Sequence, residues 1–262
     1  MENRIKVESH EHLQKEIELH KELSQEYKKR YKYKFSTLFQ TYWNNTLIKE
    51  IENCSSAKVL DFGCGNGILL GDLAEKCDFA VGLDASIDMV RDIKSEHGEN
   101  INIIVGDGEN LPVCAESFET VICRGTLHHL SSLSQGLKEI KRCLKKNGLL
   151  IFSEPSNDSI IVRIARSVMY KFSRKFHEDD IAFYEKEVIK TVEKEGFIVE
   201  KTQRFGFLAY VLIGFPDHLP IMKYVPFNLQ VSRVLIAFDR FLARLPFIKS
   251  QSLHLIVKAR KM

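Results

Sequence analysis

Three glycines at alternate positions, Gly63, Gly65 and Gly67, interrupt the apolar stretch VLDFGCGNGILL of residues 59–70. An apolar run that carries one carboxylate, Asp61, precedes the glycines, and an apolar run with helical spacing follows them. Glycine loses much conformational freedom on folding, so three of them between a strand and a helix indicate that something lies against the backbone. A strand, a glycine turn and a helix are the arrangement that binds nucleotide-like ligands at the carboxyl edge of a sheet.

The spacing of these glycines disfavours two common phosphate-binding motifs. A dinucleotide-binding GxGxxG loop that starts at Gly63 requires glycine at position 68, which is Ile68. A P-loop requires GK[ST] after the turn, and this stretch does not contain it. A pyrophosphate on the following helix N-terminus is therefore poorly supported. The pattern that remains is Asp-x-Gly-x-Gly-x-Gly, from Asp61 to Gly67.

Short apolar runs alternate with amphipathic segments after residue 57, which is typical of βαβ units around a buried parallel sheet. The hydrophobic fraction of 44% is sufficient for a sizeable core. Strands are predicted at residues 58–62, 79–84, 101–107, 117–125, 149–155, 197–205 and 252–261. Helices are predicted in the first 35 residues and at residues 38–51, 67–77, 86–98, 131–148, 160–176, 180–196 and 231–245.

Five motifs in order resemble those of the class I S-adenosylmethionine-dependent methyltransferases, over roughly Lys58 to Pro155. The motifs are VLDFGCGNG, VGLDAS, GDGENLP, FETVICRGTLHHL and LKKNGLLIFSEP. The chain is most similar to the broad group that contains the ubiquinone/menaquinone-biosynthesis and related small-molecule methyltransferases. The resemblance implies an α/β fold with a doubly wound, mostly parallel seven-stranded Rossmann-like sheet, helices on both faces and an antiparallel last strand.

The same resemblance implies S-adenosylmethionine as the cofactor and assigns roles to several residues. The glycine loop would run under the methionine part, whose amino end Asp61 would help to hold. Asp84 would bind both ribose hydroxyls, because a carboxylate matches the paired donors of a cis diol. Asp107 would accept from the adenine amino group, and the Gly108 backbone would meet the ring edge. The full predicted cofactor set is Asp61, Gly63, Cys64, Gly65, Gly67, Asp84, Ala85, Asp107, Gly108, Cys123 and Arg124.

Candidate catalytic side chains follow the fourth and fifth predicted strands. His128 and His129 could take a proton near neutral pH, with His129 slightly preferred, and Glu154 could orient a substrate hydroxyl. Each also has a purely structural interpretation, as a helix-start feature or as a partner of the backbone. Methyl transfer needs a general base only when the acceptor loses a proton, so no fixed catalytic residue is required. No metal site is expected from the histidines of the N-terminal helix, His10, His12 and His20.

The chain is divided by pattern into three parts: residues 1–52 as a helical cap, 53–156 as the cofactor-binding core and 157–262 as a substrate-side half. The cap is expected to close over the cofactor, through Tyr31 or Tyr33. From Lys201 onward the formal charge is +8, which leaves −5 on the first 200 residues of a chain whose total is +3. Two apolar helices with basic flanks are predicted at 160–176 and 231–245, and they would form a lid or touch anionic membrane. The alternatives are that they form an added core layer or a dimer face.

The resulting hypothesis is methyl transfer to a small, apolar or lipid-like acceptor. RNA methylation and non-catalytic binding of the cofactor are the alternatives, although the intact acidic and glycine set disfavours the second. Six cysteines without a CxxC pair and a charged N-terminus predict a cytoplasmic protein, with peripheral membrane contact in the lid hypothesis. The acceptor atom and the oligomeric state stay open.

Overall fold

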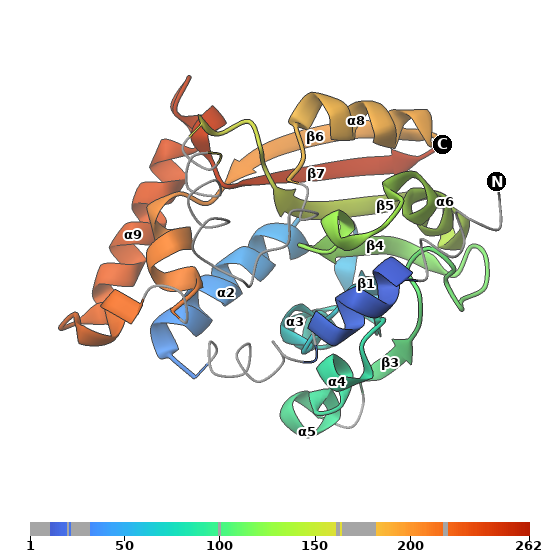
Figure 1. Ribbon diagram of the computed structural model, residues 1–262, viewed down its shortest axis with the longest axis horizontal. Helices are drawn as coiled ribbons and strands as arrows, with labels where there is room; N and C mark the ends of the chain where they lie inside the picture. The colour runs from blue at the N-terminus through green and yellow to red at the C-terminus, as the bar shows by residue number, and fades with distance from the viewer. Residues whose placement is uncertain are drawn as a thin grey trace.

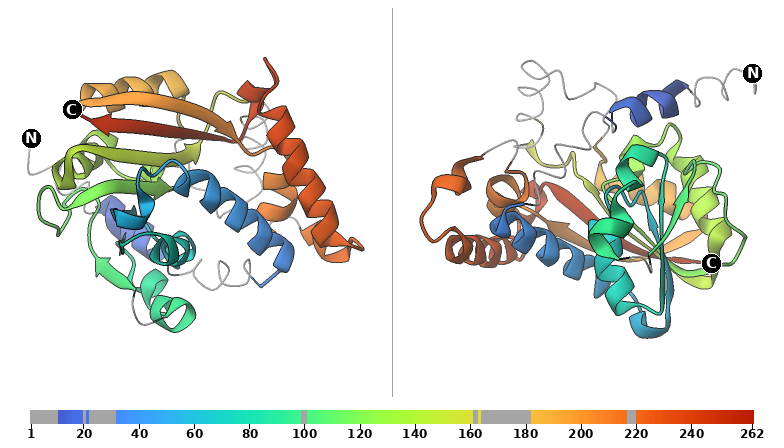
Figure 2. Two further views of the ribbon diagram at one scale, coloured as in Figure 1. Left: turned by 180° about the vertical axis from the view of Figure 1, so that it is seen from behind. Right: turned by 90° about the horizontal axis from the view of Figure 1, so that it is seen from below.

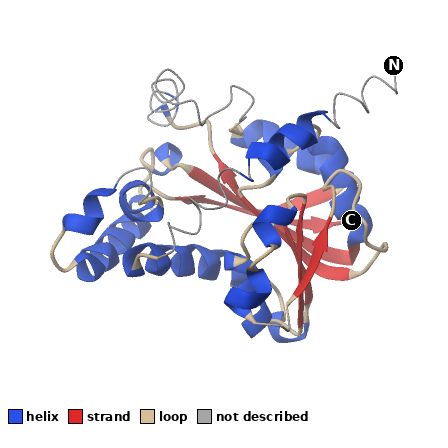
Figure 3. Ribbon diagram, turned by 60° about the horizontal axis from the view of Figure 1, so that its bottom comes forward, coloured by secondary structure: helices blue, strands red, loops and turns tan. Residues whose placement is uncertain are grey.

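The computed structural model describes residues 11–19, 21, 32–98, 101–160, 163, 182–216 and 220–262. Its centre is a seven-stranded sheet, flanked by helices in Figures 1 and 3. The strands are β1 (Lys58–Phe62), β2 (Phe79–Asp84), β3 (Asn102–Val105), β4 (Phe118–Arg124), β5 (Leu144–Pro155), β6 (Phe197–Phe205) and β7 (His254–Lys261). The spatial order is β3-β2-β1-β4-β5-β7-β6. The pairs from β3 to β5 are parallel and β7 runs antiparallel to both its neighbours, as the family resemblance predicts.

Helices connect the strands and precede the sheet. Residues 11–19 are helical, and the longer helices are α2 (Lys34–Ile48), α3 (Ile68–Lys76), α6 (Leu133–Cys143), α8 (Glu185–Lys194) and α9 (Asn228–Leu242). Shorter elements are α4 (Ile87–Val90), α5 (Ile93–His97), η1 (Cys54–Ser56), η2 (Leu127–His129), η3 (Tyr210–Gly214), η4 (Pro220–Tyr224) and η5 (Lys249–Gln251). Within the described part of the chain, no helix has the length and apolar character to cross a bilayer.

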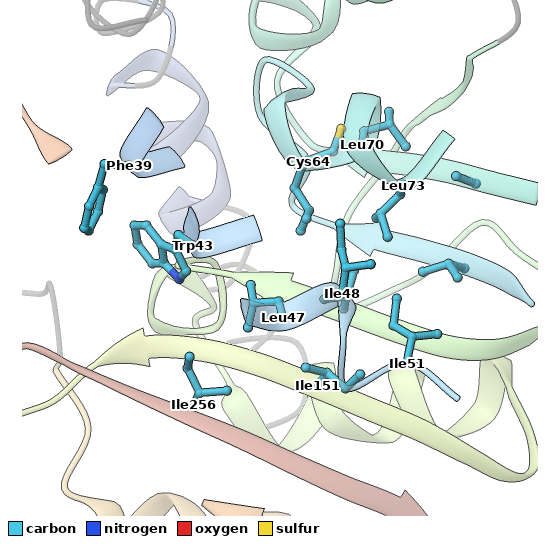
Figure 4. Packing of buried hydrophobic residues seen from close by; sticks show 14 of the residues in the cluster. Phe39, Trp43, Leu47, Ile48, Ile51, Cys64, Leu70, Leu73, Ile151 and Ile256 are labelled. Carbon is cyan, nitrogen blue, oxygen red and sulfur yellow. The ribbon is translucent and has the colours of Figure 1, made fainter. Parts of the chain in front are cut away.

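Alternating side chains on the strands build one hydrophobic cluster on each face of the sheet. Ile151 of β5 belongs to the cluster with α2 and α3, whereas its neighbours Leu150 and Phe152 belong to the cluster with α6 and α8. In Figure 4, Trp43 and Leu47 of α2 lie over the first face. Helix α2, which lies within the predicted cap of residues 1–52, therefore packs into the hydrophobic cluster on this face.

Three predicted helices differ from the observed elements. The helix expected at 180–196 begins only at Glu185, because Phe183 pairs with Ser156. The helix expected at 131–148 ends at Cys143, because Leu144 is buried and already pairs with Phe118 of β4. Asn147 has a left-handed φ of 61°, and the register of β5 shifts in this region before regular pairing resumes at Leu149. The helix expected at 86–98 is divided into α4 and α5. Most of the predicted helix 160–176 lies outside the described residues.

Candidate functional site

The glycine loop after β1 adopts a backbone conformation that side chains resist. Gly63, Gly65 and Gly67 have φ values of 73°, 53° and 81°, all in the left-handed region. The loop is tied to β2, because the backbone N–H groups of Gly63 and Cys64 donate to the Leu83 carbonyl over 2.7 and 2.9 Å. A Cβ on Gly63 would collide with the Thr126 side chain, so close packing adds to the backbone requirement there. Gly67 is the residue from which α3 begins.

Asp84 ends β2 directly beside this loop. Its Oδ2 accepts from the Gly65 N–H at 2.8 Å, and its Oδ1 accepts from the Ser86 N–H at 2.9 Å. The carboxylate is half-buried, and each of its oxygens can accept more than the one hydrogen bond it receives. Ala85 and Ser86 follow, and the buried Ser86 hydroxyl has no hydrogen-bond partner in the described part of the chain. The Asp84 carboxylate can therefore accept further hydrogen bonds beside the loop, as the two hydroxyl groups of a diol would require.

Asp61 is a buried carboxyl inside β1, with only 1% of its surface exposed. Burial raises its pKa to about 7; the Arg124 guanidinium lowers the pKa and the Asp84 carboxylate raises it. Among the residues that the structure describes, its Oδ2 has no hydrogen-bond partner. A buried acceptor without a donor is costly unless a ligand supplies one. An ammonium group is the donor that would satisfy this oxygen best.

Asp107 and Gly108 follow β3. This strand neighbours β2, which Asp84 ends, on the side away from β1. Asp107 Oδ1 accepts from the Glu109 N–H at 2.8 Å, which fixes the carboxylate in the turn. A Cβ on Gly108 would come within 2.5 Å of Cζ of Phe62, so this backbone lies directly against an aromatic ring. A carboxylate beside a backbone edge and an aromatic face suits a flat heterocycle with few polar groups.

Cys64 and Cys123 are buried and pack in opposite clusters. Cys64 belongs to the α2 and α3 face, and Cys123 of β4 belongs to the α6 and α8 face. Burial raises the pKa of both thiols well above the usual range. Cys123 is fully buried, so its thiol is a core side chain.

Arg124 ends β4 and is held by three side chains of α2. It donates to Asn44 Oδ1 over 2.6 Å and also to Gln40 Oε1. Its guanidinium carbon lies 4.1 Å from the centroid of the Trp43 ring, a cation–π distance. The cation therefore has a fixed place between α2 and the carboxyl edge of the sheet, where it acts on Asp61 electrostatically.

Glu154, near the end of β5, is buried and pairs with His128 of η2, the short helix after β4. Oε2 of Glu154 lies 2.6 Å from Nδ1 of His128, and Oε1 accepts from the N–H groups of Thr126 and Leu127 at 2.9 and 2.8 Å. Glu154 is 1% exposed and the His128 side chain 12%. Glu154 thus pairs with the backbone, as one of its two interpretations predicts, and its orientation of a substrate hydroxyl stays a prediction.

His129 points to a different carboxylate. Its Nδ1 lies 3.0 Å from Oε2 of Glu16, in the helical residues 11–19 that are dark blue in Figure 1. His12 Nε2 is 3.0 Å from the His129 carbonyl oxygen. The rings of His128 and His129 lie 4.0 Å apart between centroids. The N-terminal helix therefore contacts the edge of the site through His12 and Glu16.

The structure does not describe Tyr31. Tyr33 stacks on Phe35 with ring centroids 5.4 Å apart, and the Lys223 ammonium lies 4.6 Å from the Tyr33 ring. Closure of the site through either tyrosine stays a prediction. Among the residues that the structure describes, no group of three or more His, Cys, Asp or Glu side chains is placed to hold a metal ion.

A buried polar chain beside Glu154 is missed by the sequence analysis. Trp43 Nε1 donates to the Ser153 hydroxyl at 3.1 Å, and that hydroxyl is 3.3 Å from Nδ1 of His254. Nε2 of His254 is 2.7 Å from the Tyr210 hydroxyl. Aromatic rings surround the chain, since Trp43 stacks on Phe205 with 5.4 Å between centroids. The only signal in the sequence is an isolated histidine in an apolar strand.

The site fits the cofactor implied by the glycine loop. The unsatisfied Oδ2 of Asp61 suits the ammonium of the methionine part, Asp84 suits the ribose diol, and Asp107 with Gly108 suits adenine. These residues lie at the carboxyl ends of adjacent parallel strands, where a sheet of this topology binds its ligand. The fold and the site together define a class I methyltransferase domain.

Comparison with known proteins supports this class. Residues 60–152 match the family described as "Methyltransferase domain". A demethylmenaquinone methyltransferase of Corynebacterium kroppenstedtii is 25% identical over 185 residues, 71% of this chain and 72% of that protein. The chain therefore carries a methyltransferase domain over residues 60–152, the segment that holds the glycine loop, Asp84 and Asp107, and S-adenosylmethionine is its cofactor.

Two solved structures show the same fold. A methyltransferase from Thermotoga maritima, described as a possible histamine N-methyltransferase, has a TM-score of 0.63 at 18% identity and covers 94% of this chain and 99% of its own. Magnesium protoporphyrin IX methyltransferase from Synechocystis, solved with bound SAH, has a TM-score of 0.57 at 16% identity. It covers 87% of this chain and 84% of its own.

Proposed function

We propose that this enzyme transfers the methyl group of S-adenosylmethionine to an apolar, ring-bearing acceptor of the quinol type. The observation that carries the proposal is the Glu154–His128 pair, which lies near the ends of β5 and β4 at the carboxyl edge of the sheet that also holds Asp61 and Asp84. The similarity to a demethylmenaquinone methyltransferase favours the same class of acceptor. A ring that carries a hydroxyl would find a proton acceptor at this pair.

The Glu154–His128 pair can accept the proton that a ring hydroxyl would lose. The bound cofactor supplies an electrophilic methyl group on a sulfonium, and the C–S electron pair leaves with the sulfur as the acceptor forms its bond to the methyl carbon. Removal of the hydroxyl proton makes the ring carbon a stronger nucleophile, and after methyl transfer that carbon releases its own proton while the oxygen regains one, which restores the aromatic ring and its hydroxyl. With a proton on Nδ1 and facing Glu154, His128 carries its lone pair on Nε2. Glu154 would then hold the ring in place and stabilise the imidazolium that forms.

The test follows methyl transfer from labelled cofactor into three classes of acceptor. The acceptors are a prenylated 1,4-naphthoquinol that lacks the ring methyl group, transfer RNA, and histamine as a small amine. Label in the quinol is the expected result. Label only in RNA or only in the amine, or label in none of the three although the cofactor binds, would refute the quinol acceptor.

Substitution of the two histidines separates a base from a packing residue. His128→Asn is expected to lower kcat by about 10²-fold or more, with an unchanged dissociation constant for the cofactor. His129→Asn is the matched control, because its ring nitrogen lies against Glu16 and not against Glu154. An equal loss in both variants would assign the effect to packing of the loop.

A further inference from the structure

Helix α9 has one face that is buried in the fold and a second, apolar face that is exposed. Ser232, Ile236 and Asp239 are buried on the side that packs against the rest of the protein. Val234, Phe238 and Phe241 follow one another at intervals of four and three residues, so they share another face. They are 68%, 43% and 54% exposed. Figures 1 and 2 place α9 at the outer edge of the molecule, beyond α2.

The segments on either side of α9 continue this exposure. Tyr224 and Phe227 before the helix are 84% and 77% exposed, and Phe247 after it is 90% exposed. Isolated apolar side chains on a surface are ordinary, but a continuous series of large ones marks an interaction site. Residues 220–250, all described by the structure, are called the α9 surface below.

The charge of the α9 surface has one sign. Its five basic residues are all exposed, namely Lys223, Arg233, Arg240, Arg244 and Lys249. Its single acid, Asp239, is buried and accepts from the N–H groups of Phe207 and Ala209 at 2.8 and 3.1 Å. Asp239 therefore tethers α9 to the chain after β6 and does not offset the exposed charge.

The three arginines lie along one flank of the apolar face. Arg233, Arg240 and Arg244 are spaced by seven and four residues, and each is one or three residues from an exposed apolar position. This pattern is typical of an interfacial helix, in which long basic side chains reach anionic headgroups while the apolar face enters the acyl boundary. Pairing with a second copy would bring surfaces of like charge together.

We infer that the α9 surface binds peripherally to anionic lipid membrane. The binding goes beyond the proposed function, because it needs neither the cofactor nor an acceptor. It would bring an enzyme for an apolar acceptor to the phase in which such an acceptor dissolves. The anchors are Phe238 and Phe241, with Arg240 and Arg244 as the adjacent cations.

The experiment measures sedimentation of the full chain with vesicles, without cofactor. Vesicles of phosphatidylcholine with about 30% phosphatidylglycerol are expected to bind the protein at low salt, and pure phosphatidylcholine vesicles to bind it at least tenfold more weakly. High salt is expected to weaken the binding because the charges become screened. Absence of binding to the anionic vesicles, or equal binding to both kinds, would overturn the inference.

Matched substitutions locate the contact. Phe238→Ser with Phe241→Ser is expected to lower partitioning at least about tenfold, and Arg240→Glu with Arg244→Glu at least about 25-fold, since each basic residue near an anionic surface contributes about fivefold. The control for the phenylalanine variant is Ile87→Ser with Ile198→Ser, because these side chains are 60% and 55% exposed and lie outside the α9 surface. The control for the arginine variant is Lys94→Glu with Lys138→Glu, at two exposed lysines outside that surface. Equal losses in test and control variants would contradict the assignment to α9.

Two further readouts keep the outcomes distinct. A dimer in analytical ultracentrifugation that dissociates in the phenylalanine variant would assign the α9 surface to self-association and refute the membrane inference. Methyl transfer to a water-soluble acceptor analogue is expected to stay unchanged in all these variants. Lost vesicle binding with intact transfer would thus test this inference alone, whereas a failure of the quinol assay would leave it standing.

Discussion

Asp61→Asn is expected to stabilise the cofactor-free protein while weakening its affinity for the cofactor. Burial raises the pKa of this carboxyl from 3.8 to about 7. Between these values the unfolded chain has released the proton that the folded protein keeps, so stability falls as the pH rises through this window. A difference of this size corresponds to about 4 kcal/mol at about 1.4 kcal/mol per pH unit. Asparagine removes the ionisation and its cost.

The expected gain in free energy of unfolding at pH 8 is at most about 4 kcal/mol, since the amide also leaves hydrogen-bonding groups without partners. Denaturant unfolding of wild type and Asp61→Asn at pH 4 and pH 8 measures it, with a much smaller gain expected at pH 4. A variant that is less stable than wild type at pH 8 would refute the reasoning.

The affinity for the cofactor is expected to fall in Asp61→Asn, whereas the stability of the cofactor-free protein is expected to rise. The ammonium group prefers the ionised carboxylate, so binding is expected to release a proton near pH 7 and the dissociation constant to rise about tenfold from pH 8 to pH 6. Asp61→Asn should bind more weakly at pH 8, by about 10- to 100-fold, and lose most of this pH dependence. Calorimetry in buffers of different ionisation enthalpy reports the proton directly. A variant with the same pH dependence as wild type would exclude Asp61 as its source.

Two further substitutions test the supports of the site. Gly63→Ala is expected to destabilise the protein and abolish cofactor binding, because φ is 73° and the new methyl group would collide with Thr126; calorimetry and thermal unfolding report the two effects. Asp239→Ala should cost about 2–4 kcal/mol in denaturant unfolding, because two buried N–H groups lose their acceptor, whereas the nearby Ser232→Ala should cost under about 1 kcal/mol. Equal costs would contradict the tether.

The residues that the sequence located best are those at strand ends. Asp84 and Asp107 follow apolar runs, and parallel strands bring their carboxyl ends to one edge, so local pattern and topology are sufficient to place them there. The helix predicted through Gly148 shows the limit of local pattern. Pairing of Leu144 with Phe118 replaces helical continuation, and that pairing depends on a strand 26 residues away.

The buried chain beside the site depends on contacts that no local pattern contains. Ser153 and His254 are 101 residues apart and meet because β7 inserts between β5 and β6. Trp43 reaches Ser153 from α2 across 110 residues, and Glu16 reaches His129 across 113. The sequence also did not show which apolar side chains of α9 are exposed. It predicted the helix, but buried and exposed faces can be distinguished only from the packing of the helix.

The central claim is that the glycine loop and the acids around it bind S-adenosylmethionine. Calorimetry with S-adenosylmethionine and S-adenosylhomocysteine, on wild type, Asp84→Ala and the nearby control Asp88→Ala, tests it most directly. Binding by wild type and by the Asp88 variant, together with its loss in Asp84→Ala, is the predicted result. No binding by well-folded wild type, or undiminished binding by Asp84→Ala, would contradict the assignment of this site.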